Sequence, residues 1–130
     1  MPFQFLIHPE RLAIARLDSG AALPEWARGG FVVVARTPVE LSIVCAQRHV
    51  PAGILHERDK LGLCIEGTVP MTSVGIIASL SRALADARIP IFVVATYDTD
   101  WILIGAERFE AARAALESLG HAVRGEAPPA

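Results

Sequence analysis

The second half of the chain has the clearer pattern of apolar and polar positions. Residues 61–65 alternate with a period of two, which predicts a strand with one buried face. Apolar residues then recur at helical spacing over 76–87, after Thr72 and Ser73, either of which can cap a helix N-terminus. The pattern therefore predicts a strand and then a capped helix that stops before Ile89-Pro90.

Four further elements and a turn follow in the same half. Ile91–Ala95 and Trp101–Ile104 are compact apolar runs on either side of the turn-forming segment Tyr97–Asp100, which predicts a β-hairpin. Glu107–Leu119 has an apolar face at helical spacing and ends at Gly120, a typical residue after a helix. His121–Arg124 completes the set as a short strand.

The order β-α-β-β-α-β over Leu61–Arg124 is typical of the ferredoxin-like α+β arrangement. It predicts a four-stranded antiparallel sheet with both helices on one face. The other face is then expected to meet water or to be covered by another surface.

The first half is less regular. Arg11–Leu17, Phe31–Arg36 and Ser42–Ala46 are interpreted as strands, and Thr37–Glu40 matches a capping box, which predicts one helical turn. We interpret Phe3–Val50 as a degenerate copy of the same unit, shortened at its first helix.

Composition limits the class of protein. The chain has 130 residues, 52% of them hydrophobic, and a formal net charge of −2. These values suit one domain or two small subdomains and argue against disorder and nucleic-acid binding. No apolar run reaches the roughly 18 residues that span a bilayer, and no basic leader precedes the first apolar stretch. A cytoplasmic location without membrane association is therefore expected.

The cysteines and histidines give no sign of a metal site. Cys45 and Cys64 each lie within an apolar run, which is typical of small buried hydrophobic residues. The histidines lack ligand spacing beside either cysteine and are expected in solvent: His8, His49, His56 and His121. No cofactor or metal is predicted.

The acidic turn Asp98-Thr99-Asp100 allows three interpretations. A carboxylate pair after an apolar strand can hold Mg²⁺ in a phosphatase, but that class needs a larger doubly wound domain and a later lysine, and the only lysine is Lys60. The aspartates can also simply shape a hairpin turn. In the third interpretation, Asp98 or Asp100 binds the ammonium group of a small ligand.

The start of the predicted helix at Ser73–Ile76 is the second candidate. Free amides and the helix dipole favour a carboxylate there, and Gly75 allows a close approach. An amide cluster facing a carboxylate suits a zwitterion, that is, a free amino acid. One β-α-β-β unit need not bring the two segments together, so a second subdomain or chain is a possible contributor. No nucleophile, phosphate loop or dinucleotide fingerprint is present, so the chain is not expected to be an enzyme.

Three segments together resemble the tandem ACT-domain proteins, which are related to aspartokinase regulatory modules and to CASTOR-type amino-acid sensors: Arg36–Cys45, Thr72–Leu80 and Ala95–Leu103. The resemblance implies two ACT-like subdomains in one chain, at 1–59 (degenerate) and 60–124, followed by a disordered tail at 125–130. It also implies a ligand at an interface between ACT units, held by Ser73, Val74, Gly75, Ile76, Thr96, Tyr97, Asp98, Thr99 and Asp100. The family usually has glycine in a left-handed conformation where this chain has Arg88.

The sequence thus predicts a non-catalytic regulatory module that binds a free amino acid at an inter-subdomain or inter-subunit interface. A homodimer is the expected assembly. The alternative is a structural or oligomerisation module that binds no small ligand.

Overall fold

The computed structural model describes residues 2–130 of the chain. It contains two compact units: unit 1 comprises residues 1–9 and 61–128, and unit 2 comprises residues 10–60 and 129–130. Strand β5 (His56–Ile65) supplies residues to both units. The N-terminal segment therefore belongs with the C-terminal unit, whereas the sequence assigned all of 1–59 to one subdomain.

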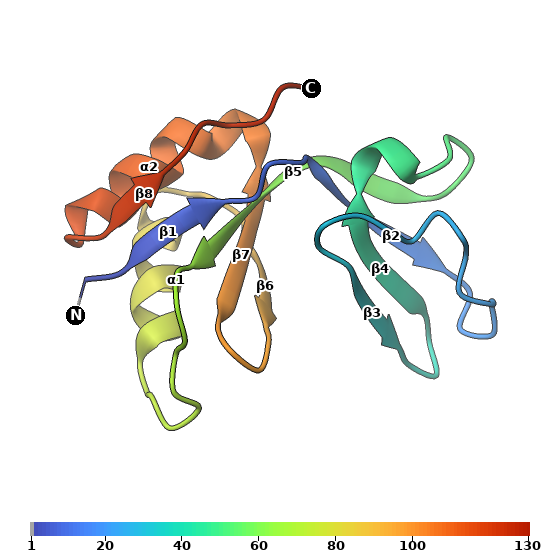
Figure 1. Ribbon diagram of the computed structural model, residues 1–130, viewed down its shortest axis with the longest axis horizontal. Helices are drawn as coiled ribbons and strands as arrows, with labels where there is room; N and C mark the ends of the chain where they lie inside the picture. Colours follow the sequence, from blue (N-terminus) through green and yellow to red (C-terminus); the bar gives the residue numbers. More distant parts are fainter. Residues whose placement is uncertain (1) are drawn as a thin grey trace. The chain divides into compact units, whose positions relative to one another are not determined.

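Unit 1 is a mixed α+β structure in which both helices lie against one sheet (Figure 1). Its sheet has the strand order β6-β7-β5-β1-β8. The elements other than β5 are β1 (Gln4–Ile7), α1 (Ile76–Asp86), β6 (Phe92–Ala95), β7 (Asp100–Gly105), the 3₁₀ helix η2 (Ala106–Arg108), α2 (Phe109–Ser118) and β8 (Ala122–Arg124). The predicted β-α-β-β-α-β order and the hairpin between β6 and β7 are confirmed.

A fifth strand corrects the expected four-stranded antiparallel sheet. β1 lies between β5 and β8; it is antiparallel to β5 and parallel to β8. Phe5 pairs with Ile65 and with Val123, and all three side chains are buried in the same core. The partners of this short strand are distant in sequence, so local periodicity gives little sign of it.

The core of unit 1 lies between the sheet and the two helices. Leu61, Leu63 and Ile65 point to this side, as do Ile102 and Ile104, in agreement with the period of two. The helices contribute further fully buried side chains to the same cluster: Leu80 and Leu84 from α1, and Ala112 and Leu116 from α2. Burying each such leucine contributes about 1.5–3 kcal/mol to folding.

The start of α1 differs from the prediction. Its N-cap is Gly75 in the left-handed conformation (φ 82°), and no side chain caps the helix. Thr72 and Ser73 were the expected caps, but Ser73 instead closes a turn, in which its amide donates to the Pro70 carbonyl at 3.0 Å. The chain therefore enters the helix through a glycine-dependent bend.

Both helices end in the same hydrogen-bonded motif. At the end of α1, the amides of Arg88 and Ile89 donate to the carbonyls of Ala85 and Leu84, each at 2.9 Å. Arg88 has φ 60°, the left-handed conformation expected at this position.

At the end of α2, the Gly120 amide donates to the Glu117 carbonyl at 2.9 Å and the His121 amide to the Leu116 carbonyl at 3.2 Å. Gly120 has φ 92°, which confirms its predicted role. The two helices thus differ at this position by an arginine in place of a glycine.

Unit 2 is a small sheet of order β3-β4-β2-β5, in which the first part of β5 is an outer strand. Its other elements are β2 (Leu12–Leu17), β3 (Val33–Arg36), β4 (Leu41–Ala46) and the 3₁₀ helix η1 (Gln47–His49). The three strands predicted here are confirmed. Its core comprises Ala15, Leu41, Ile43 and Cys45, and no α-helix occurs in residues 10–60.

The predicted helical turn at Thr37–Glu40 is wrong. The Thr37 hydroxyl accepts the amides of Val39 and Glu40, as in a capping box, but the Thr37 amide donates to the Glu40 carbonyl at 2.9 Å. The segment therefore closes the β3–β4 hairpin, because the same side-chain contact also stabilises a tight turn.

Three single residues refine the sequence-based picture. Cys45 is buried as predicted, whereas Cys64 is only half-buried. His121 is buried rather than solvated: its Nδ1 accepts a hydrogen bond from the Phe3 amide at 2.9 Å, and its ring stacks on the Phe3 ring.

Neither helix in residues 2–130 is long and apolar enough to cross a membrane.

Candidate functional site

The loop after β5 and the β6–β7 turn meet within unit 1. The Thr99 hydroxyl donates to the Ile65 carbonyl at 2.8 Å, and the Val69 amide donates to the Asp98 carbonyl at 2.6 Å. The reason is topological: β7 pairs with β5, so the end of β5 lies beside the start of β7. A single unit thus brings together the two segments for which a second subdomain or chain had been considered.

These segments line a cavity of about 600 Å³ that is partly open to solvent. Its size falls within the range of small-molecule sites. Seven of the nine residues predicted for the site line it: Ser73, Gly75, Ile76, Thr96, Tyr97, Thr99 and Asp100. Val74 and Asp98 do not line it, and both are exposed.

The first turn of α1 supplies amide donors to the cavity. The first helical hydrogen bond runs from the Ser79 amide to the Gly75 carbonyl at 3.0 Å, so the amides of Ile76, Ile77 and Ala78 precede it. Within residues 2–130 no hydrogen bond engages these three amides, and all three residues line the cavity. They lie where the helix dipole favours negative charge, so this end of the cavity suits a carboxylate.

Asp100 supplies the opposite charge. It lies two residues before Ile102 in β7, so strand alternation directs its side chain to the helix-covered face. It is the one charged side chain lining this cavity among the described residues, and no hydrogen bond or ion pair engages its carboxylate there. Burial raises the pKa of the neighbouring Cys64 thiol, and the charge of Asp100 raises it further.

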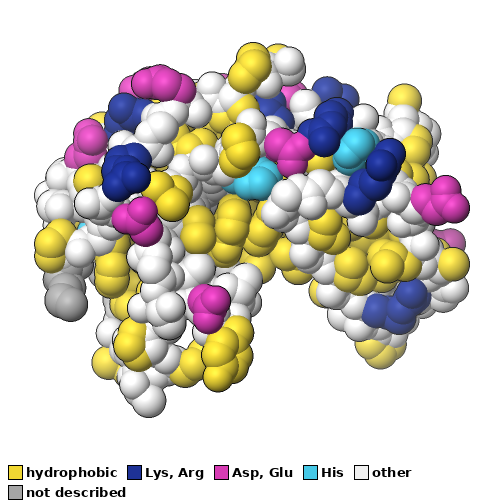
Figure 2. Space-filling model, viewed as in Figure 1, with side chains coloured by type: hydrophobic (Ala, Val, Ile, Leu, Met, Phe, Trp, Pro, Cys, Tyr) yellow, Lys and Arg dark blue, Asp and Glu magenta, His cyan; other side chains and the backbone are white. Residues whose placement is uncertain are grey.

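The surroundings of the cavity lack positive charge. Figure 2 shows hydrophobic and acidic side chains, and no Lys or Arg, around the start of α1 and the β6–β7 hairpin on the face drawn. The sequence agrees, since residues 61–81 and 89–107 contain no lysine or arginine. A cation on the ligand therefore meets no repulsion from side chains of these segments.

The two threonines of the β6–β7 turn, Thr96 and Thr99, have a structural role. The Thr96 hydroxyl donates to the Thr99 carbonyl at 3.0 Å and accepts the Thr99 amide at 3.3 Å. The Thr99 hydroxyl holds the end of β5, as described above. The polar groups of the turn thus mainly fix its shape, which leaves the Asp100 carboxylate available to a ligand.

Sequence reasoning missed the apolar part of the lining, which consists of Val69, Pro70, Met71, Ile77, Ala78 and Ala95. Ile77 and Ala78 follow directly from the start of a helix at 76, because its first turn carries all the free amides. The loop residues 69–71 gave no such signal, since their position depends on the hydrogen bond between Val69 and the hairpin.

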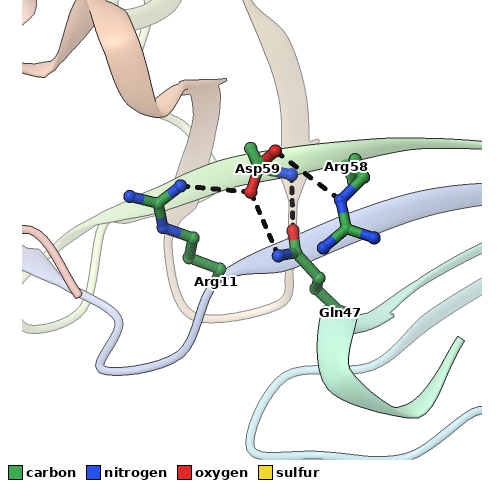
Figure 3. Close-up of polar contacts among 4 residues, drawn as sticks. All are labelled: Arg11, Gln47, Arg58 and Asp59. Atoms are coloured by element: carbon green, nitrogen blue, oxygen red, sulfur yellow. Dashed lines mark hydrogen bonds and ion pairs between the residues drawn. The ribbon is translucent and has the colours of Figure 1, made fainter. Parts of the chain in front are cut away.

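The most connected polar cluster belongs to unit 2 and has a structural role (Figure 3). Asp59 accepts from Arg11 and from the Gln47 amide group, each at 3.1 Å, and its own backbone amide donates to Gln47. Arg58 lies 3.6 Å from its other carboxylate oxygen. Asp59 has φ 60° at the irregularity in the pairing of β2 with β5, so the cluster stabilises a β-bulge.

The described residues contain no group of three His, Cys, Asp or Glu side chains that could hold a metal ion. The sheet of unit 1 also differs from the doubly wound parallel sheet that the phosphatase interpretation of Asp98 and Asp100 required. The acidic turn is thus a β-hairpin turn with one carboxylate directed into a cavity.

Known proteins agree with this architecture. The family model of the ACT domain matches residues 56–118. A crystal structure of protein Atu0741 from Agobacterium tumefaciens is 32% identical, with a TM-score of 0.90, and the match covers 97% of this chain and 95% of that one. The chain therefore contains an ACT domain, which spans residues 56–118. A second family model, of an N-terminal domain, matches residues 10–53. No curated protein matches this ACT-domain protein.

Two more distant structures share the fold. A Vibrio cholerae protein of unknown function, described as a possible transport protein, has a TM-score of 0.70 at 20% identity, over 89% of this chain and 88% of that one. The ligand-free regulatory subunit of aspartate kinase from Thermus thermophilus has a TM-score of 0.59 at 13% identity, over 86% and 95%. The tandem ACT-like fold predicted from the sequence is therefore confirmed.

Proposed function

We propose that this ACT-domain protein binds a free amino acid in the unit 1 cavity and acts as a regulatory module without chemistry of its own. The observation that carries the proposal is the pairing, in one cavity, of the free amides of α1 with the unpaired carboxylate of Asp100. An α-amino acid carries one negative and one positive group, and the cavity offers a partner to each.

The α-carboxylate accepts hydrogen bonds from the amides of Ile76, Ile77 and Ala78 in this proposal. The α-ammonium donates to Asp100. Gly75 supports the arrangement, because its left-handed conformation turns the chain into the helix and a side chain there would be strained. The groups that bind are thus held by a helix and a strand rather than by mobile loops alone.

Regulation requires that binding change an interaction of the protein. Three large apolar side chains are exposed around the cavity: Met71, Val74 and Tyr97. Exposed apolar residues gathered in this way are typical of interaction sites. We propose that a second copy of the chain packs on this rim in the cytoplasm, and that a ligand stabilises the homodimer in proportion to its preference for the assembled form.

The binding proposal is tested by isothermal titration calorimetry of each of the twenty amino acids into the purified chain. At least one is expected to bind with a dissociation constant in the millimolar range or below. Asp100→Asn should weaken that binding about 10- to 100-fold, because it removes a hydrogen bond between charged groups. Asp98→Asn is the matched control, since Asp98 is exposed outside the cavity and its loss should leave the affinity unchanged.

An equal effect of the two aspartate variants would contradict the proposed role of Asp100. The dimer is tested separately by analytical ultracentrifugation with and without the bound amino acid. The apolar rim also supports a second candidate, a structural or oligomerisation module without a small ligand. In that case the chain associates, no amino acid binds, and Tyr97→Ser weakens the association.

A further inference from the structure

We infer that the ligand is an α-amino acid with an uncharged, apolar side chain. The inference rests on the proposed function and adds the class of side chain that the cavity accepts. Beyond the partners of the two backbone charges, most lining side chains are aliphatic or thioether in character, with Val69, Met71, Ile77 and Ala95 among them. The remaining ones carry hydroxyl groups (Ser73, Thr96, Tyr97 and Thr99), and the hydroxyls of Thr96 and Thr99 already hydrogen-bond within the fold. A side chain of the same character gains the free energy of burial on this lining.

An acidic ligand side chain finds no cationic partner in the cavity. The amides of the first turn of α1 already bind the α-carboxylate, and residues 61–81 and 89–107 contain no lysine or arginine that could pair with a second one. Asp100 would in addition repel it. Aspartate and glutamate are therefore rejected.

A basic ligand side chain is rejected for a related reason. Asp100 is the one charged side chain lining the cavity in the part of the chain that the structure describes, and it already pairs with the α-ammonium group of the ligand. The nearby carboxylate of Asp98 does not line the cavity. A lysine or arginine side chain would therefore bring an unpaired cation against Val69, Met71 or Ile77, and desolvating such a charge without a partner is unfavourable.

Competition within the same calorimetric panel tests the inference. Leucine, isoleucine, valine, methionine or phenylalanine should bind at least about 100-fold more tightly than aspartate, glutamate, lysine or arginine. Tightest binding by a charged or a small polar amino acid would overturn the inference and leave the proposed function intact. Binding by none of the twenty would overturn both.

Substitution of the lining residue Met71 should change which amino-acid side chain the cavity prefers. Met71→Glu puts a carboxylate on the lining, and Met71 is 77% exposed, so the fold should tolerate it. Binding of the apolar amino acid should weaken about tenfold, and binding of lysine or arginine should strengthen. Leu55→Glu is the matched control, because Leu55 is 70% exposed and belongs to unit 2. If both variants change the preference equally, or neither does, Met71 does not meet the ligand side chain and the inference fails.

Discussion

The two helix ends provide a comparison within one molecule. Arg88 and Gly120 occupy the same position of the same motif, with φ 60° and φ 92° respectively. An arginine in the left-handed conformation costs about 1–2 kcal/mol, because its Cβ crowds the following backbone. Glycine avoids that cost but loses about 0.5–1 kcal/mol more conformational entropy on folding. Arg88→Gly should therefore stabilise the chain by about 0.5–1 kcal/mol.

The reverse change at the other helix should destabilise it by a similar amount. A Cβ at Gly120 meets no atom within 4 Å, so Gly120→Ala introduces the conformational cost without a clash. The Arg88 carbonyl, which accepts from the Arg108 side chain at 3.3 Å, is a backbone group and stays in the glycine variant. The two substitutions thus isolate the cost of the left-handed conformation.

Urea denaturation followed by circular dichroism measures both free energies of unfolding. The shift in melting temperature should be roughly 2–4 °C in each direction. Arg82→Gly, within α1 and exposed, is the control and should cost about 1 kcal/mol, since glycine is unfavourable where φ is helical. Destabilisation by Arg88→Gly as large as that by Arg82→Gly would refute the conformational explanation.

Two further predictions concern single polar residues. Asp59→Ala should lower the free energy of unfolding by about 1–2 kcal/mol, because the bulge loses its side-chain hydrogen bonds to Gln47 and Arg11. Asp59→Asn should cost less, since asparagine tolerates positive φ and its side chain can still form hydrogen bonds. Urea denaturation compares the two variants. Burial lowers the pKa of His121, whose Nδ1 must be unprotonated to accept the Phe3 amide. The unfolded chain then takes up the proton first, so stability is complete above about pH 6.5 and falls as the pH drops below it. His121→Asn should reduce this loss between pH 7 and pH 5, and an unchanged pH dependence would contradict the assignment.

Sequence patterns predicted unit 1 well wherever residues close together along the chain decide the local structure. The alternation around Leu63, the helical spacing of α1 and α2, and the hairpin at Asp98 all follow from side chains a few residues apart. The left-handed end at Gly120 was predictable for the same reason, because a helix end is a local motif, whereas the sequence left the conformation of Arg88 open.

Local patterns failed where two conformations share the same short-range contacts. The Thr37 hydroxyl accepts nearby amides both in a helical turn and in a hairpin, and only the pairing of β3 with β4 selects the hairpin. The loop before α1 likewise contains residues that commonly cap helices. Gly75 is the N-cap instead, at the end of a loop that a hydrogen bond from the Val69 amide ties to the hairpin.

What the sequence by itself determined is the set of elements in unit 1 other than β1, their order and most of the polar groups of the candidate site. What only the tertiary structure decided is the position of β1 between β5 and β8, the burial of His121 and the choice of Asp100 over Asp98 as the carboxylate of the cavity. The physical reason is the same in each case. Pairings between strands far apart in the chain carry no periodic signal, yet they determine which strand ends meet and which side chains face one another.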